Sequence, residues 1–289
     1  MSILINKNTR VVVQGITGKQ GSFHTKEMMN YGTNIVAGVT PGRGGMEVEG
    51  IPVFDTVAEA IEKQQADASV IFVPAPLAKE AAFEAIGAGI KVLVIVTEHI
   101  PFHDALQIVD YSVKKNVVQI GPNSFGICSA GQAKIGIPPN SIFTPGPVGV
   151  VSRSGTLTYE IVSNLSLRGV GQTTCLGLGG DSVVGLSFVD ILRLFEKDNE
   201  TRAVVLIGEI GGRQEEEASI YIKSMTKPVV GYIAGKSAPP GKRMGHAGAI
   251  IERGAGGFKS KVESLKQAGV KVAEIPSQVA DYVADLLKR

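Results

Sequence analysis

Residues 235–257 combine a single histidine, His246, with a high density of glycine and several cations. Small neighbours such as Gly245 and Ala247 allow a backbone or an oxyanion to approach the imidazole closely. The cations favour an anion at this place; they are Lys236, Lys242, Arg243 and Arg253. This environment suits a histidine that carries a phosphoryl group, although the same residues also fit a surface loop whose histidine has no chemical role.

Two further stretches hold the other groups that histidine phosphorylation requires, namely a partner for the second ring nitrogen and donors for the phosphate oxygens. Glu209 lies between glycines at the end of an apolar run and could accept an imidazole N–H. Ser154, Gly155 and Thr156 open a predicted helix with Ser154 as its N-cap, and the positive end of a helix attracts phosphate. Each stretch also fits an ordinary turn or capped helix.

Near the N-terminus, the glycines Gly15, Gly18 and Gly21 follow an apolar run and precede a helical pattern. This GxxGxxG spacing is a variant of the dinucleotide fingerprint, and a tight turn with close helix packing explains it equally well. At the end of the next strand an NAD site expects an acidic residue, but the chain has Arg43. A cation there suits an extra phosphate on the ribose, as in NADP or coenzyme A, unless it is only a solvated loop charge.

Apolar β-branched runs alternate with helical patterns along the chain, which indicates parallel sheets covered on both faces. The predicted strands are residues 10–14, 34–39, 69–73, 91–96, 117–120, 148–152, 173–176, 203–207, 229–233 and 270–272. The predicted helices are residues 20–30, 57–64, 77–88, 102–115, 156–167, 188–195, 215–225, 259–268 and 278–288. A segment rich in Gly, Pro and Ser, residues 123–147, separates a first α/β domain, residues 1–122, from a second one, residues 148–289.

Composition excludes several classes of protein. The net charge of +2 argues against a nucleic-acid binder, and no apolar run is long enough to span a membrane. The two cysteines suggest neither disulfides nor a metal site, and we expect a cytoplasmic protein that binds no metal. Nucleotide-binding motifs such as Walker A are missing, so a nucleotide that phosphorylates His246 is expected on another chain.

The chain resembles the α subunits of succinate–CoA ligase (succinyl-CoA synthetase) over nearly its whole length. The motifs that carry this resemblance are VSRSGTLTYE (151–160), IGEIGG (207–212) and GKRMGHAGAII (241–251). The resemblance implies an α/β fold with an N-terminal Rossmann-like CoA-binding domain followed by a flavodoxin-like ligase domain, both with mainly parallel sheets. It also implies a β subunit whose ATP-grasp site binds ATP or GTP with Mg. The implied reaction joins a carboxylic acid to coenzyme A at the expense of a nucleoside triphosphate, through a phosphohistidine and an acyl phosphate.

The resemblance also implies roles for single residues. His246 is the phosphorylated histidine, Glu209 binds its ring, and the Ser154–Thr156 loop (Ser154, Gly155, Thr156) holds the phosphoryl group. Tyr159 lies near the carboxylic acid. The residues expected to contact coenzyme A are Thr17, Gly18, Lys19, Gln20, Arg43, Val96, Thr97 and Glu98.

One departure from the family pattern bears on the substrate. The family usually has GPNCPG where this chain has GPNSFG, with Ser124 and Phe125 close to where thioester and acid should meet. Ser124 keeps a polar group for the substrate, while Phe125 is larger than proline. This departure makes malate or citrate alternatives to succinate as the acid; if Phe125 only repacks the linker, the departure carries no information about the acid. Two competing hypotheses are a non-catalytic CoA-binding regulatory protein and an NADP-dependent oxidoreductase.

Overall fold

The computed structural model describes residues 2–239, 241–251 and 256–288, and these residues form two compact units. The first unit comprises residues 4–140 and 183–186. The second comprises the described residues of 141–182 and 187–288, together with Ser2 and Ile3. The division of the chain at residues 122 and 147 stays a prediction.

The first unit contains a seven-stranded sheet in which only the short β3 is antiparallel to its neighbour. Its order is β3-β4-β2-β1-β5-β6-β7. The strands are β1 (Arg10–Gln14), β2 (Asn34–Val39), β3 (Glu47–Val48), β4 (Ile51–Phe54), β5 (Ala68–Ile71), β6 (Val92–Ile95) and β7 (Val118–Ile120). Without β3 this is the Rossmann arrangement, whose strand order reverses between β1 and β5 and opens a crevice for a ligand there.

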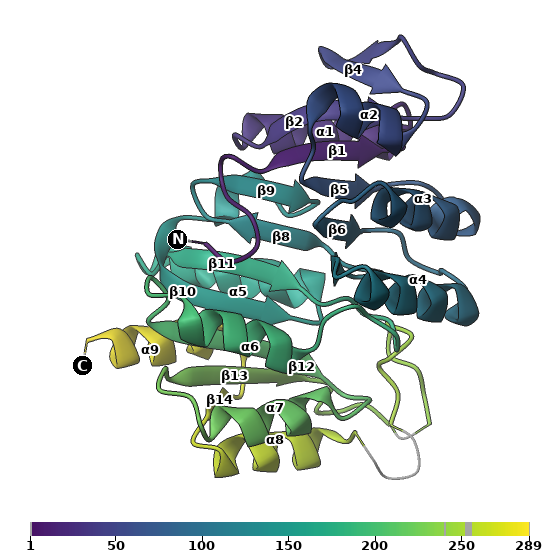
Figure 1. Ribbon diagram of the computed structural model, residues 1–289. Coiled ribbons are helices and arrows are strands. Elements are labelled where there is room, and N and C mark those ends of the chain that lie inside the picture. Colours follow the sequence, from purple (N-terminus) through teal and green to yellow (C-terminus); the bar gives the residue numbers. More distant parts are fainter. Residues whose placement is uncertain (1, 240, 252–255, 289) are drawn as a thin grey trace. The chain divides into compact units, whose positions relative to one another are not determined.

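Four helices connect these strands: α1 (Lys19–Asn30), α2 (Val57–Gln64), α3 (Ala75–Gly87) and α4 (Phe102–Lys114). The helices α2, α3 and α4 pack side by side over a core in which Val12, Ile71 and Leu93 are fully buried (Figure 1). Thr56 caps α2 by accepting a hydrogen bond from the amide of Glu59. Helix and strand thus alternate as the apolar pattern predicts.

The segment interpreted as a linker contains an antiparallel hairpin, β8 (Gly126–Ser129) and β9 (Ala133–Gly136), followed by a 3₁₀ turn at Asn140–Ile142. The hydroxyl of Thr33 fixes the hairpin to the rest of the unit, since it accepts a hydrogen bond from the amide of Lys134 and donates one to its carbonyl. The hairpin was not predicted, because strands of four residues give only a weak periodic signal and the surrounding prolines and glycines are typical of a loop.

The second unit contains five parallel strands in the order β14-β13-β12-β10-β11. They are β10 (Pro145–Ser152), β11 (Gln172–Gly177), β12 (Ala203–Glu209), β13 (Val229–Ala234) and β14 (Lys271–Ala273). This is the flavodoxin-like order, in which the direction of winding reverses between β10 and β12. The loops that follow these two strands therefore border a ligand crevice.

Five helices cover this sheet: α5 (Gly155–Leu167), α6 (Phe188–Lys197), α7 (Gln214–Ile222), α8 (Phe258–Gln267) and α9 (Pro276–Leu287). The helices α6, α7 and α8 lie on one face and α5 packs with α9 on the other (Figure 1). Ser187 and Asp190 form a capping box at the start of α6. The predicted fold class is confirmed. Among the described residues, no helix is both long and apolar enough to cross a bilayer.

Candidate active site at the edge of the second sheet

Glu209 is the last residue of β12, and its carboxylate lies against the ring of His246. The Nδ1 atom of His246 is 3.0 Å from both carboxylate oxygens of Glu209. A carboxylate accepts, so Nδ1 carries the proton and Nε2 keeps its lone pair. The imidazole therefore presents a nucleophilic nitrogen on the side away from Glu209. Glu209 is buried, and the side chain of His246 is 29% exposed.

The backbone of Gly180, in the turn after β11, lies directly against the imidazole. A Cβ atom at this position would be 2.5 Å from Cγ of His246. The carbonyl of Gly180 also accepts a hydrogen bond from the amide of Gly248, two residues after the histidine. The small residue that makes room for the ring therefore comes from a distant part of the sequence.

Charges around the ring act on the pKa of His246 in opposite directions. The hydrogen bond to Glu209 is the largest influence and raises this pKa, whereas burial lowers it. The negative charge of Glu209 raises it further, Arg153 lowers it and Asp181 raises it, so that the net shift is upward. The neutral, nucleophilic form of the imidazole consequently gains population as the pH rises through that raised pKa.

Arg153, directly after β10, is buried between two carboxylates. Its Nη2 atom is 3.5 Å from Oε1 of Glu209, and its Nη1 atom is 3.3 Å from Oε1 of Glu215. Nη1 also donates a hydrogen bond of 2.9 Å to the carbonyl of Gly211. Glu215 in turn accepts from the amide of Glu209 and pairs with the fully buried Lys261. This buried charge cluster consists of Glu209, Arg153, Glu215 and Lys261.

Most of this cluster was not predicted from the sequence. Glu215 lies in the acidic first turn of α7, which begins one residue before the predicted helix, but its complete burial was not predicted. No role was predicted for Arg153 or Lys261. The glycines around Glu209 were a usable signal, because Gly208 packs against Glu215 and Gly211 against the main chain of Gly248.

The start of α5 offers free backbone donors, as predicted. Ser154 occupies the N-cap position, but its side chain makes no capping hydrogen bond. Its amide instead donates to the hydroxyl of Ser152. Among the described residues, none accepts a hydrogen bond from the amides of Gly155 or Thr156. These two N–H groups, at the positive end of a helix of 13 residues, are available to an anion.

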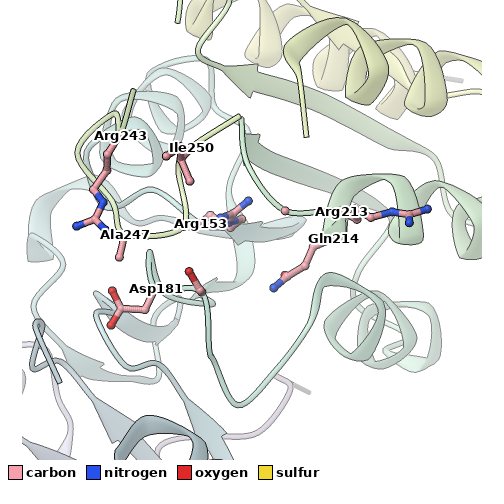
Figure 2. Close-up of a pocket in the computed structure, with 10 residues that line it drawn as sticks. Arg153, Asp181, Arg213, Gln214, Arg243, Ala247 and Ile250 are labelled. Atoms are coloured by element: carbon pink, nitrogen blue, oxygen red, sulfur yellow. The ribbon is translucent and has the colours of Figure 1, made fainter. Parts of the chain in front are cut away.

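A pocket of about 760 Å³ lies at the same edge of the sheet (Figure 2). Loops after four strands contribute to it, and its lining residues are Arg153, Asp181, Ser182, Gly212, Arg213, Gln214, Arg243, Ala247, Gly248 and Ile250. Figure 2 shows Arg243 and Arg213 on opposite sides of the pocket, with Arg153 between them. Arg153 is already paired with two carboxylates, but the exposed Arg213 and Arg243 outnumber the carboxylate of Asp181, which makes this environment favourable for an anionic ligand.

Two residues predicted to contact the acid lie in different units. Tyr159, in the second turn of α5, is half-buried, and burial raises the pKa of its hydroxyl. It therefore stays protonated near neutral pH and can donate a hydrogen bond. Ser124 belongs to the first unit, where its buried hydroxyl accepts a hydrogen bond from the amide of Gly126 at 2.9 Å. Phe125 beside it is also buried.

In the first unit, the predicted coenzyme A residues follow β1, β2 and β6, all at the carboxyl edge of the sheet. The Thr17 hydroxyl donates to the hydroxyl of Thr40 at 3.1 Å, which connects the loop after β1 to the loop after β2. The Thr97 hydroxyl donates to the carbonyl of Val73 at 2.7 Å and connects the loop after β6 to the loop after β5. Exposed on these loops are Gly18, Lys19, Gln20, Arg43 and Glu98, while Val96 is half-buried.

The glycines of the first loop are required by its packing. Gly15 has φ of +80°, and a Cβ on Gly21 would be 2.1 Å from the carbonyl oxygen of Gly15. The start of α1 can therefore approach the end of β1 only without side chains at these positions. Gly18 is the N-cap of α1 and has no side chain to occupy the space in front of the helix. This geometry suits a phosphate group at the helix N-terminus.

No group of three or more His, Cys, Asp or Glu residues that could hold a metal ion occurs within residues 2–239, 241–251 and 256–288.

Comparison with known proteins gives a consistent result along the whole chain. A family model described as a CoA binding domain matches residues 6–99, and one described as CoA-ligase matches residues 151–271. The chain is 58% identical to the succinate–CoA ligase [ADP-forming] subunit alpha 2 of Archaeoglobus fulgidus over 99% of this chain and 100% of the relative. It is 56% identical to the corresponding subunit alpha of Aquifex aeolicus, over 100% of this chain and 95% of the relative.

Solved structures share the fold. An ATP citrate lyase from Methanothrix soehngenii, in complex with citrate and coenzyme A, superposes with a TM-score of 0.89 at 25% identity. The match covers 99% of this chain and 51% of that one, so the chain spans about half the length of the lyase. An acetyl-coenzyme A synthetase from Ca. Korarchaeum cryptofilum gives a TM-score of 0.77 over 96% of this chain at 20% identity, which supports the fold alone.

Proposed function

Since the chain belongs to the succinate–CoA ligase α-subunit family, we propose that it is the subunit that carries the phosphoryl group on His246 and binds coenzyme A. The complete enzyme joins a carboxylic acid to coenzyme A, with a nucleoside triphosphate converted to the diphosphate and phosphate. The observation that carries this proposal is the bond of 3.0 Å between Nδ1 of His246 and the buried carboxylate of Glu209.

In the first step, Nε2 of His246 attacks the terminal phosphorus of the nucleotide, and the diphosphate leaves. Glu209 stabilises the positive charge that develops on the ring, because the Nδ1–H group stays bonded to its carboxylate. The amides of Gly155 and Thr156, with Ser154, bind the phosphoryl oxygens, and the positive end of α5 favours their charge.

In the second step, a carboxylate oxygen of the acid attacks the phosphorus and His246 leaves as neutral imidazole. The sulfur of coenzyme A then attacks the carbonyl carbon of the acyl phosphate and inorganic phosphate leaves. Tyr159 and Ser124 are the proposed contacts of the acid. The burial of Tyr159 supports this role, because it raises the pKa of the hydroxyl and keeps it protonated, and a protonated phenol can donate a hydrogen bond to a carboxylate.

We assign coenzyme A to the first unit, at the crevice between β1 and β5. The main-chain groups of Gly18, Lys19 and Gln20 at the start of α1 meet a phosphate of the cofactor, together with the Thr17 hydroxyl. Arg43 binds a further phosphate. The segment Val96–Glu98 lines the same crevice from β6.

We further propose a β subunit with an ATP-grasp site for the nucleotide and its Mg. The α-subunit relationship and the lack of a Walker A motif in this chain support it. Succinate is the proposed acid because both quoted relatives carry it in their names. Citrate is the second candidate, supported by the likeness to an ATP citrate lyase and by Phe125 in place of proline. A cytoplasmic location stays a prediction.

Phosphorylation of the isolated chain and of its complex with the β subunit tests this function. With labelled ATP or GTP, we expect acid-labile phosphate on the complex and none on the chain alone. The label is lost in His246→Ala, and persistence of label in that variant contradicts the assignment. Turnover of the complex with succinate, malate and citrate then identifies the acid.

A further inference from the structure

We propose that Arg153 is the positioning residue of the phosphorylated histidine: it fixes the carboxylate of Glu209 and, through it, the orientation of the His246 ring. This inference rests on the proposed phosphorylation of His246. It assigns a role to a side chain that is not itself expected to react.

The carboxylate of Glu209 needs a fixed counter-charge. Its side chain is 8% exposed, so water cannot solvate it fully, and an unpaired buried charge is strongly unfavourable. Within the described part of the chain, Arg153 is the permanent cation at ion-pair distance, 3.5 Å from Oε1 of Glu209. His246 is the other partner, but its charge depends on pH and it changes chemically during the proposed reaction.

Arg153 is itself held rigidly enough to serve as a reference point. Its side chain is 4% exposed and bonds to the carbonyl of Gly211 and to Glu215. Glu215 is completely buried and is neutralised by Lys261, which also donates to the carbonyl of Gly212. Charges of alternating sign thus extend from α8 through α7 to the loop after β10 and reach the imidazole last.

The position of Arg153 also gives it an electrostatic effect on the ring. The charged groups that face His246 are Glu209 at the end of β12, Arg153 after β10 and Asp181 after β11. Glu209 and Asp181 favour the protonated imidazole, whereas Arg153 favours the neutral one and so keeps Nε2 nucleophilic. Arg153 therefore allows a strongly orienting carboxylate to coexist with a ring that is still able to attack phosphorus.

The test is the single-turnover rate of phosphorylation of His246 in the complex with the β subunit, measured from about pH 5.5 to 8.5. The variants are Arg153→Gln, Arg153→Lys and Glu209→Gln. The matched control is Arg193→Gln, since Arg193 is an exposed arginine on α6 that pairs only loosely with Asp190.

We expect Arg153→Gln to slow phosphorylation by about ten- to a hundredfold, as for other residues that orient a reacting ring. The acidic limb of its pH–rate profile moves to higher pH, because removal of the cation raises the pKa of His246 further. Glu209→Gln moves the limb the opposite way. Arg153→Lys keeps the charge but lacks the planar fork, so its rate falls while its limb stays in place.

A wild-type rate with an unchanged pH–rate profile in Arg153→Gln overturns the inference. A slower rate without a shift of the acidic limb also overturns it, because that result indicates a merely structural role. If thermal unfolding shows that Arg153→Gln does not fold, Arg153→Lys decides, and an unchanged rate in that variant refutes the positioning role. Absence of label on His246 in the wild-type complex instead removes the proposed function itself.

Discussion

Substitution of Gly180 by alanine tests how closely the imidazole of His246 is held. The φ angle of Gly180 lies outside the left-handed region, so the alanine backbone itself is unstrained. The new Cβ, however, would lie 2.5 Å from Cγ and 2.6 Å from Cδ2 of His246. Carbon atoms in contact keep about 3.5 Å between them, so the ring has to move by about 1 Å.

Glu209 cannot follow such a movement, because β12 and Arg153 hold it. The bond of 3.0 Å between Glu209 and Nδ1 is therefore stretched or lost. A misplacement of about 1 Å in a reacting group costs on the order of a hundredfold in rate, and we expect that loss in Gly180→Ala.

The assay is single-turnover phosphorylation of the complex with the β subunit by labelled nucleotide. The control is Gly87→Ala, where the new Cβ meets only the hydroxyl of Tyr111 at 3.5 Å, an ordinary contact. Gly180→Ala should melt within a few degrees of wild type, since the strain falls on the single, partly exposed ring of His246. A wild-type rate of histidine phosphorylation in Gly180→Ala would refute the argument that this contact sets the ring position.

Three further predictions concern buried groups. Lys261→Met leaves the buried carboxylate of Glu215 to share the single cation of Arg153 with Glu209 and should lower the free energy of unfolding by about 3–5 kcal/mol, measured by urea titration. Gly21→Ala should abolish coenzyme A binding in calorimetry, because its Cβ would collide with the Gly15 carbonyl; undiminished affinity would contradict this. Burial lowers the pKa of Lys134 to about 8, below its unfolded value of about 10.4, so the folded state loses this proton first as the pH rises. The free energy of unfolding of wild type relative to Lys134→Met should therefore increase from pH 8 to about pH 10. A difference in free energy that stays constant across that window would contradict this prediction.

Most of the fold was predictable because long buried strands carry their own signal. The strands β1 and β2 have the predicted bounds, and the other long strands differ from prediction by a few residues at their ends. The elements that were missed, β3, β4, β8 and β9, are two to four residues long. Pairing with neighbouring strands, rather than local periodicity, stabilises such short elements.

The candidate site was only half predictable, and the reason is physical. Glu209, His246 and the start of α5 could be found because glycine and helix-capping residues mark them in the sequence. The remaining charges could not: Glu215 and Lys261 occupy helical positions that look like solvent-exposed surface, and their burial follows from the packing of α7 against α8. A local pattern does not record which charges meet in three dimensions.

The burial of Arg153 and its partners has a consequence for how the enzyme responds to salt. Mobile ions screen exposed charges over a Debye length of about 8 Å at physiological ionic strength, but they act far less on pairs from which solvent is excluded. The rigidity of the histidine's support should thus be the same in dilute buffer and in concentrated electrolyte. The attraction of an anion to Arg213 and Arg243, which line the pocket and are exposed to solvent, should in contrast weaken as salt is added.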